Sequence, residues 1–188
     1  MRLRNINTVW FILVGFVLLW LLFSPETISR ESISAFLGAM GPLALFTYVL
    51  LSLSRAILMI PSTPFVLAGA ISFPDILTAV WLISAAGVVV GAFLVYSFPS
   101  FGNYDEFLEE RYPDKIGFLK EKMQGKFAFW LIAGWAFFPL VPTDAVCYVA
   151  GIAKIPFKKM ILPLLVGQLP LATVYIFLGS EIGMWLRI

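Results

Sequence analysis

The chain has 188 residues, of which 61% are hydrophobic and only 13% charged, and its mean hydropathy is +0.95. A soluble domain of this length cannot bury three fifths of its residues, whereas a bilayer accepts apolar side chains on the outside of a helix bundle. The composition therefore indicates an integral membrane protein, and a net charge of only +2 argues against a nucleic-acid partner.

The residue types also restrict the chemistry. The chain has no histidine and one cysteine, Cys147, which excludes a histidine-based metal site or triad and an intrachain disulfide. The sequence contains no glycine-rich phosphate loop, no cluster of metal ligands and no nucleophile beside a base. We therefore predict a protein that is not an enzyme and that needs neither metal nor cofactor.

Uncharged segments predict the membrane helices in chain order. Residues 8–23 form an N-terminal anchor, since no small-residue cleavage site of a signal peptide follows them. Apolar sequence resumes over residues 35–73, and residues 76–98 are the clearest transmembrane helix. The last apolar segments are residues 127–153 and residues 160–179.

Residues 99–126 differ from the rest of the chain, because they hold six acidic and five basic residues. Apolar residues recur at helical spacing before and after Pro113. This pattern predicts two short amphipathic helices, which lie on the membrane surface or pack as a hairpin in the aqueous phase.

Two segments share an outline, and each precedes a long uncharged helix. The outline consists of two prolines three residues apart, then Ala-Gly, then a further proline. The predicted hairpin-turn residues are Pro61, Pro64 and Gly69 in the first copy, and Pro139, Pro142 and Gly151 in the second.

The distribution of basic residues discriminates between two topologies. If all five apolar segments crossed the membrane, five basic residues would lie on one side and seven on the other. If the two proline-containing segments are re-entrant hairpins instead, ten share one side and only Arg30 and Arg187 lie opposite. Because basic residues in short loops stay cytoplasmic, the second topology is favoured, with the N-terminus and residues 99–126 in the cytoplasm.

The expected fold is thus an all-α polytopic membrane protein with two inverted re-entrant hairpins, each followed by a full transmembrane helix, and an N-terminal anchor. Its units are residues 1–34 (anchor and short external loop), 35–98 (first repeat), 99–126 (amphipathic linker) and 127–188 (second repeat). Two broken helices that enter from opposite faces are typical of transporters, in which they form the ligand site near the membrane midplane.

Two charged residues lie within the apolar segments, Arg55 and Asp144. An unpaired charge at membrane depth is costly, so each needs a partner or a ligand, and a phosphate headgroup suits the guanidinium group. We expect the two side chains to meet near the midplane, at the tips of opposed hairpins, and to alternate between pairing with each other and binding a headgroup. The alternatives are a purely structural ion pair between them, or capping of a helix by Asp144. The polar residues beside the prolines complete the predicted substrate site: Ser62, Thr63, Thr143 and Gln168.

These proline and Ala-Gly elements resemble the DedA and VTT-domain superfamily, also called SNARE-associated Golgi proteins, in its smaller bacterial and yeast-Golgi-like branch. The similar residues are 60–64 with 67–69, then 139–144 with 148–151, 155–157 and 167–170. The chain differs at Ala136, where similar proteins often have an arginine, and at Val66, where the DedA branch often has a carboxylate.

The resemblance implies a lipid translocator, a flippase or scramblase of phospholipid or polyprenyl-phosphate lipids. The implied partners are membrane lipids with an anionic or phosphate headgroup, with protons and a second copy of the chain left open. The implied location is the inner membrane of a prokaryotic cell. A small-solute or ion transporter on the same scaffold and a non-transporting membrane scaffold or assembly factor are the alternatives.

Overall fold

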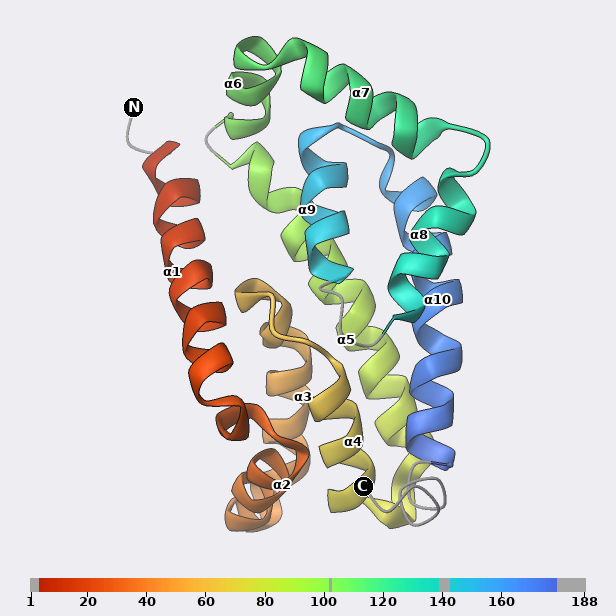
Figure 1. Cartoon of the computed structure of the whole chain (residues 1–188). Coiled ribbons are helices and arrows are strands. Elements are labelled where there is room, and N and C mark those ends of the chain that lie inside the picture. The colour runs from red at the N-terminus through yellow and green to blue at the C-terminus, as the bar shows by residue number, and fades with distance from the viewer. Residues whose placement is uncertain (1–3, 102, 139–142, 179–188) are drawn as a thin grey trace.

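The computed structural model describes residues 4–101, 103–138 and 143–178, which form helices joined by short connections with no strand among them (Figure 1). The α-helices are α1 (Arg4–Phe23), α2 (Arg30–Ala39), α3 (Ala44–Ser54), α4 (Thr63–Ser72), α5 (Leu77–Ser97), α6 (Tyr104–Arg111), α7 (Pro113–Gln124), α8 (Ala128–Phe137), α9 (Thr143–Ile152) and α10 (Phe157–Phe177). Short 3-10 helices are η1 (Pro25–Ile28), η2 (Gly41–Leu43), η3 (Arg55–Leu58), η4 (Pro74–Ile76) and η5 (Phe98–Ser100).

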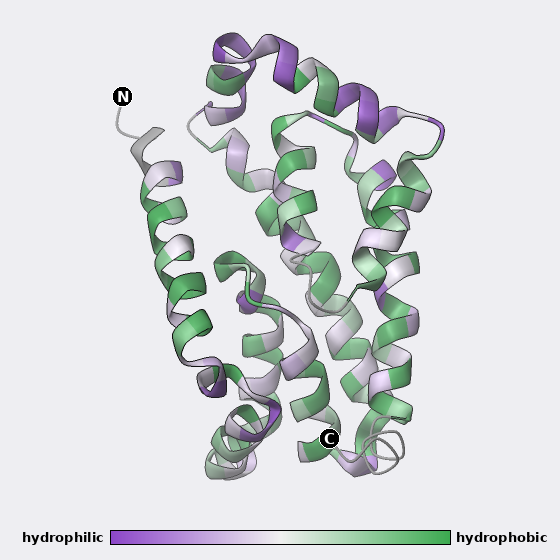
Figure 2. Cartoon of the chain, in the orientation of Figure 1, coloured by the Kyte–Doolittle hydropathy of each residue, from purple (hydrophilic) through white to green (hydrophobic). Residues whose placement is uncertain are grey.

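Three helical segments of the described chain are long and apolar enough to cross a membrane: Gly41–Leu58, Pro74–Ser100 and Phe157–Phe177. Many large apolar side chains on the outside of the bundle are exposed, such as Phe16 on α1 and Phe93 on α5. Figure 2 shows these helices as mostly hydrophobic. Since such a surface is stable in hydrocarbon and not in water, the protein is an integral membrane protein.

Two helical hairpins lie between the long helices. In Figure 1, α3 runs from the end of the molecule near α2 towards its middle, and α4 returns beside it. The pair α8 and α9 starts at the opposite end, near α7, and also reaches the middle. The two hairpins therefore point towards each other from opposite ends of the bundle.

Each returning arm packs against the long helix of the other half. Helix α4 contacts α10, and α9 contacts α5. Within each half, the long helix and the first hairpin arm meet at a glycine: a Cβ on Gly87 of α5 would lie 2.7 Å from the Ser52 carbonyl oxygen, and one on Gly167 of α10 would collide with the Ala133 carbonyl oxygen. Both contacts allow close approach of two backbones, as expected for helix packing in membranes.

The buried apolar residues form two clusters, one around α9 and one around α4. The turn after α3 contributes to both, since Met59 belongs to the first cluster and Ile60 to the second. Arg55 precedes this turn and thus lies where the two clusters meet.

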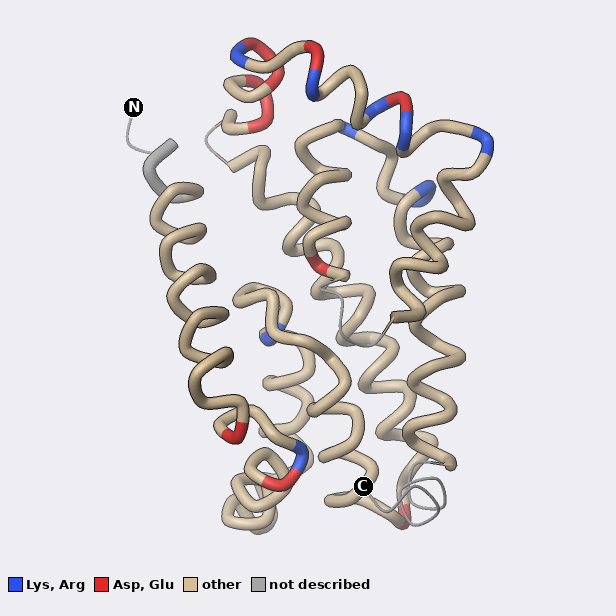
Figure 3. The backbone as a smooth tube through the Cα atoms, viewed as in Figure 1, with Lys and Arg blue, Asp and Glu red and all other residues tan. Residues whose placement is uncertain are grey.

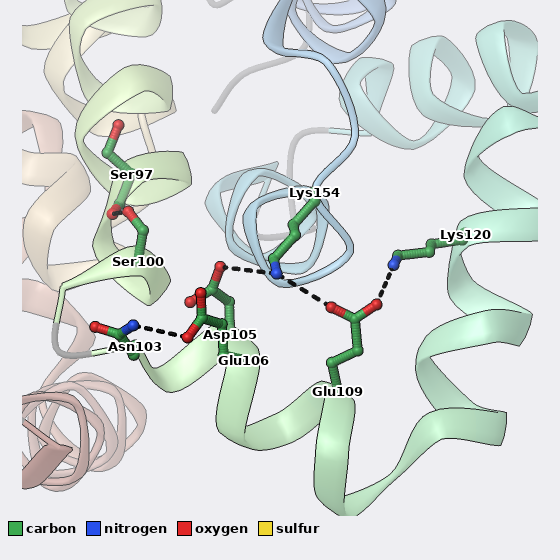
Figure 4. Close-up of polar contacts among 8 residues, drawn as sticks. All are labelled: Ser97, Ser100, Asn103, Asp105, Glu106, Glu109, Lys120 and Lys154. Atoms are coloured by element: carbon green, nitrogen blue, oxygen red, sulfur yellow. Dashed lines mark hydrogen bonds and ion pairs between the residues drawn. The ribbon is translucent and has the colours of Figure 1, made fainter.

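Helices α6 and α7 cover one end of the bundle and are rich in charged residues (Figures 2 and 3). Lys154, after α9, forms ion pairs with Asp105 and Glu109 of α6 at 3.8 and 3.1 Å, and Glu109 also pairs with Lys120 of α7 (Figure 4). The hydrogen bond from Lys120 and then that from Lys154 lower the pKa of Glu109. The hydrogen bond to Glu109 raises the pKa of Lys154. This network, which we call the Lys154 latch, fastens the linker to the second hairpin.

The segment expected as an external loop is partly helical, because α2 begins at Arg30. The Ser29 hydroxyl accepts the hydrogen bond of the Ser32 amide and caps the helix. Ile33 and Leu37, four residues apart, are buried against α4. The end of the first unit at residue 34 consequently falls inside a helix.

Candidate functional site

Arg55 begins the turn at the tip of the first hairpin. Helix α3 continues into the 3-10 helix η3, and the chain then reverses direction at Met59, whose φ of 54° lies in the left-handed region. The Arg55 side chain is buried, and its Nη1 donates a hydrogen bond of 2.9 Å to the Ile60 carbonyl oxygen. The guanidinium group thus satisfies one carbonyl that the turn would leave unpaired.

Asp144 lies in the first turn of α9, in the second hairpin. Its Oδ2 is 3.5 Å from Nη1 of Arg55, and the two side chains are only 8% and 5% exposed. The ion pair predicted from the sequence is therefore present, formed by residues from opposed hairpins. Its contact distance is long, so the carboxylate retains capacity for another donor.

A small recess with a cavity volume of about 30 Å³, partly open to the outside, adjoins this pair. Its walls come from α4, α5, α8, α9 and α10, at the meeting point of the hairpins and the long helices. Of the predicted substrate-site residues, the recess is lined by Ser62, Thr63, Thr143, Asp144 and Gln168. Arg55 is not among the lining residues and lies behind Asp144, which it contacts.

Gln168 supplies the most unusual polar group of the recess. Its Nε2 donates a hydrogen bond of 2.7 Å to the Thr143 hydroxyl. Its Oε1 is buried without a partner among the described residues. A buried carbonyl without a donor costs about 1–3 kcal/mol. The side chain is thus held in place by α9, while its acceptor atom has no donor in the part of the chain that the structure describes.

The predicted hairpin-turn residues divide into two groups. Pro61 precedes α4 and Pro64 lies in its first turn, where the missing N–H costs nothing. Gly69 and Gly151 were wrongly assigned to turns, because they lie inside α4 and α9. A Cβ at Gly69 would meet the Tyr48 ring, and one at Gly151 would meet the Tyr96 carbonyl oxygen, so both positions serve helix packing. Pro139 and Pro142 lie outside the described residues.

Three further buried polar groups were missed by the sequence analysis. Asn7 of α1 is fully buried, donates to the Phe101 carbonyl oxygen at 2.9 Å and accepts from the Tyr148 hydroxyl at 3.2 Å. Tyr48 and Ser84, which are also buried, share a hydrogen bond of 3.1 Å between α3 and α5. A lone asparagine at the start of an apolar run was the one available signal.

Residues 60–181 match the family model of the VTT domain, the domain of DedA and SNARE-associated Golgi proteins. The chain belongs to the VTT-domain family. The match covers both proline motifs and begins just after Arg55. Neither the curated proteins nor the solved structures contain a significant match.

Proposed function

We propose that this VTT-domain protein moves lipids between the two leaflets, with the headgroup passing the recess between the hairpin tips. The observation that carries the proposal is the buried Arg55–Asp144 pair beside the unpartnered Gln168 oxygen. Charged groups within a membrane protein commonly mark a substrate path, because burying them only for stability is unfavourable. Membership of the VTT-domain family agrees with a membrane transporter.

Helix lengths support hairpins that enter and leave the membrane on one side. The 10 residues of α4, of α8 and of α9 rise about 15 Å each, half of a hydrocarbon core of about 30 Å, whereas α3 with its flanking 3-10 helices, Gly41–Leu58, has the length to cross. The 21 residues of α5 and of α10 rise about 31 Å each, enough to cross. We infer that the tip of each hairpin lies near the midplane, where its broken backbone borders the recess and not lipid.

The packing of the two halves supports an inverted repeat. The contact of α4 with α10 has its counterpart in the contact of α9 with α5. The glycine contact of α5 with α3 likewise has its counterpart in that of α10 with α8. Transporters with inverted repeats change access by moving one half against the other around a fixed site.

The chemistry that we propose is an exchange of ionic partners. A phosphate headgroup that enters the recess, which must widen to admit it, displaces Asp144 and pairs with Arg55, whose planar donors suit two phosphate oxygens. The released carboxylate then binds a proton or another donor. The hydroxyl groups of Ser62, Thr63 and Thr143 donate to the remaining headgroup oxygens. When the lipid leaves, Arg55 and Asp144 pair again.

The proposed orientation places α6, α7 and the N-terminus in the cytoplasm of a prokaryotic cell, as the distribution of basic residues requires. Cysteines introduced at Tyr104 and at Arg30 are expected to react with an impermeant maleimide from opposite faces of the membrane. Labelling of both from the same face would refute the orientation and the hairpins together.

Reconstitution into liposomes tests the function directly. Fluorescent phospholipid in the inner leaflet is protected from an impermeant reductant, so a translocator makes it accessible while a protein-free liposome does not. The same assay with a polyprenyl phosphate distinguishes the two lipid classes. If neither lipid exchanges faster than in liposomes with heat-denatured protein, the proposal fails and solute transport or a scaffold role takes its place.

A further inference from the structure

One side of α7 carries basic and aromatic side chains that the recess does not use. We call Lys115, Phe118, Lys122 and Lys126 the basic strip. The first three follow one another at intervals of three or four residues on one side of α7, and Lys126 lies just beyond its last residue, Gln124. The Lys115 ammonium lies 5.3 Å from the centre of the Tyr112 ring, and that of Lys122 lies 5.4 Å from the centre of the Phe118 ring.

The cations of the strip differ from the other lysines of this region. Lys120 and Lys154 form ion pairs within the Lys154 latch, whereas Lys115, Lys122 and Lys126 have no acidic partner among the described residues. These three ammonium groups are therefore available to a ligand that brings negative charge.

The orientation of α7 follows from its buried side. Ile116 is buried, and Leu119 and Met123 pack against the same core cluster. Asp114 and Glu121, seven residues apart on the helix, lie roughly opposite this side and face away from the bundle. The strip lies between the two, on the flank of the helix, so it faces along the membrane surface and not into the bundle.

Exposed aromatic rings extend the strip towards the membrane. Phe118 is 57% exposed, and beyond the end of α7 Phe127 is 72% and Trp130 of α8 is 69% exposed. Aromatic rings beneath lysine side chains are favourable in a layer that is apolar on one side and charged on the other. An aqueous protein partner would not account for the continuity with the apolar surface of α8.

We propose that the basic strip binds the phosphate groups of anionic lipids in the adjacent leaflet and so docks the α6–α7 linker on the membrane. The rings of Phe118 and Phe127 insert at the level of the glycerol groups, and the three lysines contact the phosphates above them. The site is separate from the recess and does not depend on lipid translocation.

Native mass spectrometry of the full-length protein, titrated with phosphatidylglycerol or phosphatidylcholine, tests this site. The unsubstituted protein is expected to retain phosphatidylglycerol in preference. The double variant Lys115→Gln, Lys122→Gln is expected to bind it up to about 30-fold more weakly, since each lysine near an anionic surface contributes about a five-fold effect. Added salt should reduce the preference, because exposed charges are screened.

The matched control is the double variant Lys158→Gln, Lys159→Gln, which removes the same charge at the start of α10. It should lose less than the strip variant, and both should elute as the unsubstituted protein does in size-exclusion chromatography. An equal loss in the two double variants, or equal retention of both lipids by the unsubstituted protein, overturns the proposal. Binding of polyglutamate without any lipid preference also overturns it and assigns the strip to an acidic protein.

Discussion

Separate and joint removal of the two buried charges discriminates between a structural and a functional ion pair. The variants are Arg55→Leu, Asp144→Asn and the double substitution. Since both side chains are almost fully buried, removal of one partner leaves an uncompensated charge, a change that destabilises proteins by about 3–5 kcal/mol.

The structure predicts unequal effects of the two single substitutions. In Asp144→Asn, the Arg55 guanidinium stays charged and keeps only its hydrogen bond to the Ile60 carbonyl oxygen, so the full loss is expected. In Arg55→Leu, the carboxylate of Asp144 can bind a proton, which limits the loss to the lower end of that range or below it. The double variant leaves no buried charge but frees the Ile60 carbonyl oxygen, so it should lose about 1–3 kcal/mol and remain more stable than Asp144→Asn.

The assays are thermal unfolding in detergent, yield in the membrane, and lipid exchange in liposomes. The control pair is Arg30→Gln with Glu31→Gln, an exposed ion pair whose removal should change neither stability nor exchange. The expected result is a double variant that folds but does not exchange lipid. A double variant with full lipid exchange would refute the role that we assign to the pair, and one less stable than either single variant would refute the reasoning from burial.

Three further changes test other parts of the molecule. Gln168→Leu removes the oxygen that lacks a donor among the described residues, so the unfolding temperature should stay the same or rise. Lipid exchange should nevertheless become slower. A variant that exchanges lipid more slowly and is also less stable would contradict this prediction. Gly167→Ala forces α10 away from the Ala133 carbonyl oxygen and should lower stability by about 1–3 kcal/mol, measured against Gly134→Ala, where a Cβ meets nothing within 4 Å. The lysine partners of Glu109 lower its pKa. The ion pairs of the Lys154 latch should therefore stay formed at pH values above 4.5, the ordinary pKa of a glutamate, and break as the pH falls through the lowered pKa of Glu109. Hydrogen exchange of α6 measures this opening, and Glu109→Gln should weaken its pH dependence, leaving the contribution of the Asp105–Lys154 pair.

The sequence was sufficient to predict the main polar contact of the bundle. Arg55 and Asp144 are the only charged residues within the proline-containing apolar segments, and compensation of a buried charge is a strong requirement. The first proline pair then indicated where the first hairpin reverses, since the turn at Met59 lies just before Pro61. Both arguments depend on local sequence and on the solvent properties of the bilayer, so they need no knowledge of tertiary packing.

The sequence was insufficient where a polar group is satisfied across the fold. Asn7 accepts a hydrogen bond from Tyr148, which is 141 positions away, and no local sequence pattern predicts such a partner. Gly69 and Gly151 are of a residue type common in turns. Their role is to allow close helix packing, against a tyrosine ring in one case and a carbonyl oxygen in the other, both on neighbouring helices. The position of Arg55 behind the recess also depends on how the two hairpins meet.

The first helix touches both hairpins, which gives it a function beyond holding the chain in the bilayer. The Trp10 indole donates to the Ile57 carbonyl oxygen in the first hairpin at 2.6 Å, while Asn7 accepts from Tyr148 in the second. An unrelated anchor of equal length would insert the protein but leave these two hairpins unbridged. Helix α1 thus links the two hairpins through side-chain hydrogen bonds, and we expect its exchange for a foreign anchor to weaken the contact between the hairpins without altering any residue that lines the recess.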